Sequence, residues 1–205
     1  MLTEKQREDN RSLFCEYINR IIPSANKRAR DFILERSDFL TAPASCNKHD
    51  AEEGGLVNHS LNVLYWMIRY IPYSGDASLK DAGIFFSFAS MSLLHDICKV
   101  NYYKKETKTD GTVCYEVKDL YPFGHGEKSC DIISNIGIEM NPKERLAIRW
   151  HMGAYGLDSY NLSLYNNAVK ASPFVFPLHL ADMMAVLHGR PDDVQLRKFL
   201  EAIPF

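Results

Sequence analysis

The sequence predicts an all-α domain, a bundle of helices with one small β-hairpin inserted in it. Apolar residues recur at three- and four-residue spacing along most of the 205 residues, which is the pattern of helices with one buried face. The period changes between residues 100 and 120, where alternating residues surround an Asp-Gly pair typical of a hairpin turn. A chain of this length, 46% hydrophobic, suffices for one core, so we expect a single domain over residues 1–205.

Two helices are predicted in the N-terminal segment, residues 1–36. Apolar residues at helical spacing indicate a first helix that ends near Pro23, and residues 25–36 form a second. The composition of residues 41–50 is that of a loop, and Gly54-Gly55 interrupts the chain again before the next helical pattern.

The remaining elements are helices on both sides of the hairpin. Residues 56–70 form one helix, and residues 81–97 form a largely apolar helix that we expect at the centre of the fold. The hairpin insertion occupies residues 100–120, with its turn at Asp110-Gly111. Helical spacing then resumes over residues 127–136, 142–150 and 176–188.

Composition and charge exclude several classes of protein. A formal net charge of −2 gives no electrostatic footprint for bulk nucleic-acid binding. The first ten residues carry both signs of charge and no apolar stretch, so they are not a signal peptide. The longest apolar run, residues 82–94, is shorter than the roughly 20 residues of a membrane span. Five widely spaced cysteines without a Cys-x-x-Cys pair indicate reduced thiols, so we expect a cytoplasmic protein with no membrane partner.

The strongest chemical signal is His95-Asp96, which ends the central apolar helix. A buried carboxylate costs several kcal/mol unless a cation or several hydrogen-bond donors satisfy it. A divalent metal shared by the imidazole and the carboxylate satisfies both groups. Further potential ligands lie in or near the ends of other predicted helices, namely His59, His125, His151 and Asp182. Taken singly, a histidine in an apolar helix is more often a hydrogen-bonded core residue.

Taken together, these residues resemble a known family. Over roughly residues 40–190 their order is similar to that of the HD superfamily of metal-dependent phosphohydrolases, whose fold is an all-α bundle. The run Thr41-Ala-Pro-Ala-Ser45, with His49 and Gly54-Gly-Leu-Val-Asn-His59, resembles the HD domain of bacterial 3′-to-5′ exoribonucleases. The chain departs from that branch in one respect, because no OB-like, strand-rich domain precedes the HD-like region.

The resemblance implies a binuclear metal centre. By the family pattern, His59, His95, Asp96 and Asp182 hold the first metal, and Asp96 bridges to a second that His125 and His151 hold. Imidazole and carboxylate ligands without thiolate suit a divalent Fe, Mn, Co, Ni or Zn ion, with Mg also admitted. Two such cations about 3.5–4 Å apart lower the pKa of a bridging water and neutralise charge on the attacked phosphate.

Two lysines and an arginine near the ligands are candidates for contact with a phosphate. Lys99 follows Asp96 by one helical turn, as in the His-Asp-x-x-Lys form of many relatives, where it would stabilise charge during catalysis. The alternative for Lys99 is a lysine favoured by the dipole at a helix C-terminus. Lys128 and Arg149 lie close to predicted ligands in the sequence, and each either meets a phosphate or belongs to the charged surface.

Two further histidines and the hairpin have open roles. His49 is a substrate contact by the resemblance to the exoribonucleases, and His179 either orients Asp182, touches substrate or packs in the core. Lys104, Lys105 and the other charged residues of the hairpin indicate a solvated strand pair; a substrate lid or a dimer contact is the alternative.

The sequence thus predicts a metal-dependent phosphohydrolase in which a metal-bound hydroxide cleaves a phosphate ester of a nucleotide or related small molecule. Asp96 would bridge the metals and Lys99 would stabilise charge. One alternative is a 3′-to-5′ exonuclease or phosphodiesterase that acts on short single-stranded nucleic acid. Another is a non-catalytic HD protein that binds a nucleotide or a partner protein. No motif specifies an oligomeric state.

Overall fold

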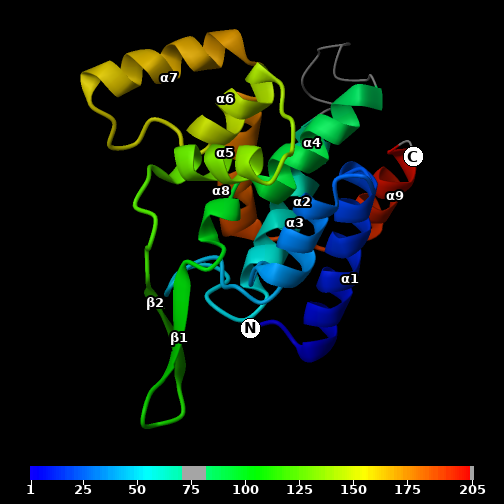
Figure 1. The fold of residues 1–205 in the computed structure, drawn as a ribbon, viewed down its shortest axis with the longest axis vertical. Coiled ribbons are helices and arrows are strands. Elements are labelled where there is room, and N and C mark those ends of the chain that lie inside the picture. Colours follow the sequence, from blue (N-terminus) through cyan, green and yellow to red (C-terminus); the bar gives the residue numbers. More distant parts are fainter. Residues whose placement is uncertain (71–81, 204–205) are drawn as a thin grey trace.

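Helices make up almost all of the regular structure in the computed structural model, which describes residues 1–70 and 82–203 (Figure 1). The helices are α1 (Glu4–Ile21), α2 (Lys27–Asp31), α3 (Gly55–Tyr70), α4 (Ala82–Leu94), α5 (His125–Asn135), α6 (Pro142–Trp150), α7 (Ser159–Ala171), α8 (Val175–His188) and α9 (Val194–Ala202). A π-helical turn at Phe32–Arg36 continues α2, and a 3-10 turn at Ile97–Lys99 follows α4. The predicted mostly helical fold is therefore confirmed. None of the described helices is both long enough and apolar enough to span a bilayer.

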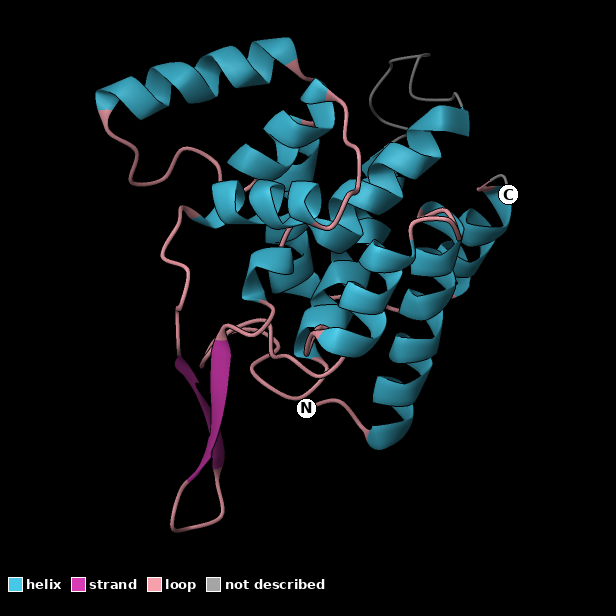
Figure 2. Cartoon of the chain, in the orientation of Figure 1, coloured by secondary structure: helices cyan, strands magenta, loops and turns pink. Residues whose placement is uncertain are grey.

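The inserted hairpin is also confirmed. Strands β1 (Tyr103–Thr107) and β2 (Val113–Val117) pair antiparallel, with Tyr103 opposite Val117 and Thr107 opposite Val113. Gly111 in the turn has φ +83°, a conformation that residues with a Cβ rarely adopt. The hairpin projects away from the helices (Figure 2), and the middle of β1 contacts the loop before α3, where Lys105 forms an ion pair with Glu53 at 3.1 Å.

The first helix is specified by its cap and its apolar face. The Thr3 hydroxyl accepts a hydrogen bond from the Gln6 backbone N–H, and the Gln6 side chain accepts one from the Thr3 N–H, which forms a capping box. The buried face of α1 includes Leu13, Phe14 and Tyr17. The Tyr17 hydroxyl donates to the Leu196 carbonyl at 2.6 Å, which ties α1 to α9.

Helix α3 lies in the middle of the bundle, where it packs against α1, α4, α8 and α9. Its side chains Leu61, Leu64 and Met67 are fully buried. Residues 41–54 lead into α3 and fold tightly against its first turn. Gly55 is required there, because a Cβ at this position would lie 2.0 Å from the Asp50 carbonyl oxygen. This close approach places the loop that carries His49 beside the first half of α3.

The predicted helix over residues 81–97 is shorter than expected, and its predicted start at Asp81 lies outside the described residues. Helix α4 ends at Leu94, and His95 and Asp96 form a turn before the 3-10 turn. Asp96 has φ −104° and ψ 16°, the bridge region in which active-site residues are often found. The backbone leaves the helix where the Asp96 side chain turns into the interior.

Two helices escaped the sequence analysis. In α7 only Ala168 is buried, so the helix lacks the apolar stripe on which the prediction depends. Its remaining signal is the Asp158 cap, whose carboxylate accepts from the Asn161 N–H at 2.7 Å. In α9 the stripe is present, because Leu196, Phe199 and Leu200 are buried, so the signal for this helix was there and was overlooked.

Candidate metal centre

Six side chains predicted as metal ligands meet in the interior, at the ends of several helices. They come from α3, the turn after α4, the first residue of α5, the residue after α6, and the middle of α8. Their potential ligand atoms form three groups, each within 4.8 Å: His59, His95 and Asp96; His95, His151 and Asp182; and Asp96, His125 and His151. The structure therefore brings together every residue that the sequence analysis assigned to the metals.

The Asp96 carboxylate lies between two pairs of imidazoles. Its Oδ2 atom is 3.5 Å from His59 Nε2 and 3.4 Å from His95 Nε2. Its Oδ1 atom is 2.7 Å from His125 Nε2 and 3.6 Å from His151 Nε2. Because each oxygen faces a different histidine pair, the carboxylate has the placement of a group that bridges two positions.

Asp182 adds a second carboxylate to one side of this cluster. Its Oδ1 atom lies 3.0 Å from His59 Nε2 and 4.0 Å from His95 Nε2. The side of the cluster that contains His59 and His95 therefore has two carboxylates, and the side that contains His125 has one. The side chain of Asp182 is 17% exposed, so the cluster is open to solvent on that side.

Unpaired nitrogen atoms show that the cluster fits a metal ion. Within the described part of the chain, His95 Nε2, His151 Nε2 and both ring nitrogens of His59 are buried and form no hydrogen bond. A buried polar atom without a partner costs about 1–3 kcal/mol, and such atoms are rare in native structures. The donors are imidazole nitrogens and carboxylate oxygens, which suit a divalent transition metal. The buried His/Asp groups can therefore hold a metal ion.

Backbone carbonyls orient two of the imidazoles. The Nδ1–H group of His95 donates to the Ser92 carbonyl at 2.8 Å, and that of His151 donates to the Ile148 carbonyl at 2.7 Å. Since a carbonyl only accepts, the proton lies on Nδ1 and Nε2 keeps its lone pair. Both Nε2 atoms face Asp96, as expected of metal-ligating histidines.

At His125, a thiol and not a backbone carbonyl lies beside Nδ1. The Sγ atom of Cys98 lies 3.4 Å from His125 Nδ1, while Nε2 of the same ring faces Asp96. Burial raises the pKa of Cys98 to about 12, so the group is a neutral thiol at physiological pH. Cys98 thus packs against a predicted ligand.

Lys99 gives the cluster its positive side chain. Its Nζ atom lies 2.6 Å from Asp96 Oδ2. Burial by itself raises the pKa of Asp96, but the Lys99 ammonium and the hydrogen bond with His125 hold that pKa well below its usual value. Burial likewise lowers the pKa of Lys99, and the Asp96 carboxylate more than offsets this and raises it. Both groups are therefore charged.

His95 and Asp182 have the protonation states that metal binding requires. Burial lowers the pKa of His95, which keeps the imidazole neutral near neutral pH. Burial raises the pKa of Asp182, but the contact with the His59 imidazole at 3.0 Å outweighs it, and the net shift is downward. A neutral imidazole and an ionised carboxylate are the forms that bind a metal.

A cavity of about 540 Å³ opens onto the cluster. His49 lines it, with its ring 4.9 Å from that of His59, and the buried Nε2 atom of His49 has no partner in the described chain. Burial lowers the pKa of His49, so this ring too is neutral at physiological pH. Part of the lining is apolar and was not predicted from the sequence; it comprises Met152, Met183, Val186 and Leu187.

The remaining substrate candidates lie elsewhere. His179 donates from Nδ1 to the His151 carbonyl at 2.7 Å. Its ring packs so closely on Gly153 that a Cβ there would lie 2.5 Å away. His179 thus supports the backbone of a predicted ligand. Arg149 forms an ion pair with Glu127 and stacks on Trp150, outside the cavity at the cluster.

Lys128 is buried beside a second, smaller cavity. Its Nζ atom lies 2.6 Å from Asp119 Oδ1 and 4.7 Å from the centre of the Tyr102 ring. Only 6% of the residue is exposed, so the sequence-based alternative of a surface charge does not describe it. Lys128 therefore borders a cavity that the predicted ligand His125 also lines.

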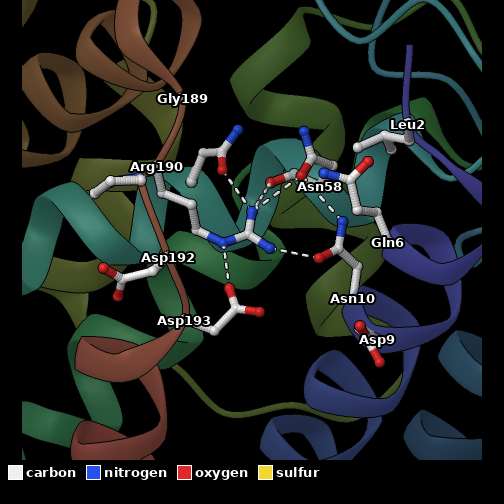
Figure 3. A pocket seen from close by; sticks show the side chains of 11 residues that line it. Leu2, Gln6, Asp9, Asn10, Asn58, Gly189, Arg190, Asp192 and Asp193 are labelled. Carbon is white, nitrogen blue, oxygen red and sulfur yellow. Dashed lines mark hydrogen bonds and ion pairs between the residues drawn. The ribbon is translucent and has the colours of Figure 1, made fainter.

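A network around Arg190, missed by the sequence analysis, fixes the segments that carry His49 and His59 (Figure 3). Arg190 donates to Asp193 Oδ1 at 2.6 Å, to Asn58 Oδ1 at 3.0 Å and to Asn10 Oδ1 at 2.5 Å. Asn58 in turn donates to Asp50 Oδ1 at 2.8 Å. Because Asn58 precedes His59 and Asp50 follows His49, the network holds both histidine segments to α1 and to the start of α9.

The chain matches no protein-family model, no curated protein and no solved structure.

Proposed function

We propose that this chain is a phosphohydrolase of the HD type, which cleaves a phosphate ester of a nucleotide or related small molecule with two divalent metal ions. The observation that supports it most is the cluster of buried, unpaired imidazole nitrogens around one bridging carboxylate. His59, His95, Asp96 and Asp182 would hold one ion, and Asp96, His125 and His151 the other. When bound, the ions supply positive charge that activates a water and neutralises the phosphate oxygens.

The chain's own residues would bind and position the phosphate. Lys99 lines the cavity and keeps its ammonium group at the cluster through its ion pair with Asp96. A fixed positive charge stabilises the charge that develops on a phosphate in the transition state. His49 has an unpaired buried Nε2 beside the cluster and would donate a hydrogen bond to a phosphate oxygen.

The cavity that adjoins the cluster would exclude water from one side of the ester. Its apolar wall includes Met183 and Leu187 of α8. Sites for small molecules are usually mostly apolar with a few polar groups that fix orientation. The combination of an apolar wall with Lys99 and His49 would suit a phosphate attached to an organic group.

Metal content is the first test of this function. We expect the protein, purified without oxygen and loaded with iron or manganese, to contain close to two metal ions per chain by elemental analysis. Asp96→Asn keeps the shape of the side chain but removes the bridging charge, so it should lose both ions. His188→Ala, at the exposed end of α8, is the control histidine and should retain them.

The second test is the activity of the metal-loaded protein. It should release phosphate or an alcohol from nucleotides and chromogenic phosphate esters, and Asp96→Asn should be inactive. Absence of bound metal after reconstitution with iron or manganese would overturn the proposal. Equal metal content in Asp96→Asn and the control would do so as well.

A further inference from the structure

His125 is held less firmly than the other three imidazoles of the cluster. Its side chain is 35% exposed, whereas those of His59, His95 and His151 are at most 1% exposed. His125 is the first residue of α5, and Gly124 before it supplies no side-chain cap to the helix. The orientation of the imidazole therefore depends on the contacts of its own ring.

Two side chains of the described chain form hydrogen bonds with this ring. Asp96 Oδ1 lies 2.7 Å from Nε2 of His125. Cys98 Sγ lies 3.4 Å from Nδ1 and 3.7 Å from Nε2. When Nε2 of a histidine binds a metal, the ring proton is on Nδ1, and here the Cys98 sulfur is the protein acceptor within its reach. A thiol sulfur is a weak acceptor, so Cys98 holds the ring more loosely than a carbonyl oxygen would.

Cys98 is itself fixed in place. The residue is 3% exposed and belongs to the 3-10 turn that follows Asp96. Its backbone N–H donates to Ser129 Oγ at 3.3 Å, and Ser129 is a buried residue of α5. The sulfur is therefore held between the turn that follows Asp96 and the helix that begins with His125.

The two metal positions also differ in the number of protein ligands. In the proposed assignment four side chains, both carboxylates included, would hold one ion, and three would hold the other. Lys99 Nζ, 2.6 Å from Asp96 Oδ2, offsets part of the negative charge at the first position but removes no ligand. Metal affinity depends on the number and rigidity of the ligands. The position with fewer ligands, one of them the loosely held His125, is therefore expected to bind its ion less tightly.

We infer that Cys98 is a positioning residue for His125, and that this pair serves the weaker and more readily exchanged of the two metal positions. The inference rests on the proposed function, which requires two positions. Cys98 acts through the ring, because without the sulfur the Nδ1–H group loses its protein acceptor and the partly exposed imidazole can turn away from Asp96. Loss of such a supporting contact typically costs roughly 10- to 100-fold in metal affinity.

Metal titration at equilibrium tests this inference. Metal-free protein would be dialysed against buffered solutions of increasing free Mn²⁺, and its metal content would be measured by elemental analysis. We expect the wild type to take up its two ions in two steps. Cys98→Ala should move the upper step to at least about tenfold higher free Mn²⁺ and leave the lower step in place. His125→Ala should remove the upper step alone, which assigns that step to this side of the cluster.

Two further variants separate the hydrogen bond from general loosening of the fold. A serine hydroxyl also accepts a hydrogen bond from an imidazole N–H, so Cys98→Ser should restore the upper step toward its wild-type position. Cys114→Ala is the matched control, because Cys114 lies on β2 and lines neither of the cavities next to the cluster. It should leave both steps where they are.

The inference is wrong if Cys98→Ala leaves the upper step in place or shifts both steps equally. It is also wrong if Cys98→Ser shifts the upper step as far as Cys98→Ala does, or if the wild type takes up both ions in a single step. In each of these cases a protein that holds two ions remains, so the proposed function stands. Absence of bound metal, with iron as with manganese, would remove the proposed function and this inference together.

Discussion

At the scale of single residues, Asp96 connects the two halves of the cluster. The residue is only 2% exposed, and its carboxylate contacts four imidazoles and one ammonium group. A buried charge is tolerated only when it is well paired. The arrangement places Lys99 in a double role, because it stabilises the carboxylate and lines the cavity where a phosphate would bind.

Substitution of Lys99 separates these roles. Lys99→Gln removes the charge near the phosphate, so we expect kcat to fall by at least about 100-fold, the order seen when one charge-stabilising donor is lost. Metal content by elemental analysis should remain close to that of the wild type. Lys104→Gln, on the exposed hairpin, is the control and should leave kcat unchanged. A kcat for Lys99→Gln within threefold of the wild type would contradict this role.

The half-buried carboxylate of Asp38 lowers the free energy of unfolding at neutral pH, and substitution should remove this cost. Burial raises its pKa, although its Oδ1 accepts the Asn101 N–H at 2.6 Å. An acid with a raised native pKa destabilises the fold at pH values above that pKa, and the cost is relieved as the pH falls through it. Asp38→Asn keeps an acceptor oxygen and removes the charge. We expect its free energy of unfolding in urea to exceed the wild type's at pH 7.

The same comparison at lower pH checks the sign. Because the wild-type carboxyl takes up a proton as the pH falls through its raised native pKa, the advantage of Asp38→Asn should shrink between pH 7 and pH 4. Asp31→Asn, in the last residue of α2, is the control carboxylate. An advantage that grows toward low pH would show that burial does not govern this group.

At the scale of elements, α6 delivers His151 to the cluster from a well-defined start. Asn141 caps the helix, since its side chain accepts from the Lys143 and Glu144 N–H groups at 2.9 and 3.0 Å. The Glu144 carboxylate accepts a hydrogen bond from the Asn141 N–H at 2.9 Å, and Pro142 occupies the first turn. The cap thereby sets where the helix begins and where its last turn presents the histidine.

Removal of this cap should cost stability without loss of the site. Asn141→Ala leaves two N–H groups of the first turn without an acceptor, and we expect a loss of about 1 kcal/mol in urea unfolding. Asn166→Ala, at an exposed position inside α7, should change stability by less than about 0.5 kcal/mol. Metal content should be the same in both variants. A loss in Asn141→Ala no larger than in Asn166→Ala would show that the cap does not specify α6.

At the scale of the whole molecule, Arg190 joins segments that are far apart in the sequence. It contacts Asn10 of α1, Asn58 and Asn62 of α3, and Asp193 before α9 (Figure 3). The network therefore holds α1 and the start of α9 against α3, next to the residue that precedes His59. The cost of breaking it is therefore expected both in global stability and at the cluster.

Arg190→Met tests this long-range role. The variant leaves the Asp193 carboxylate and three amide oxygens without their shared donor, and we expect a loss of roughly 3 kcal/mol in urea unfolding. Arg197→Met, at an exposed position of α9, is the control and should stay within about 0.5 kcal/mol of the wild type. Metal affinity should also fall in Arg190→Met, because the segments around His49 and His59 lose their tie. Unchanged stability would show that the network is dispensable.

Much of the fold follows from local patterns. The helix over 142–150 begins and ends where predicted, since Asn141-Pro142 and an apolar stripe mark it, and the Asp-Gly turn of the hairpin is equally local. Helix α7 was missed because it buries only one of its residues. The end of α4 was placed too late, because the turn at His95-Asp96 depends on what the side chains meet in the interior.

The sequence by itself determined which residue types were available and in what order, and that sufficed to name all six members of the His/Asp cluster. Only the tertiary structure decided that Arg149 lies apart, that Lys128 is buried at a second cavity, and that Arg190 ties the histidine segments together. The physical reason is range. Helix periods and caps depend on neighbours within a few residues, whereas cavities and buried charge networks depend on packing between segments distant in the chain.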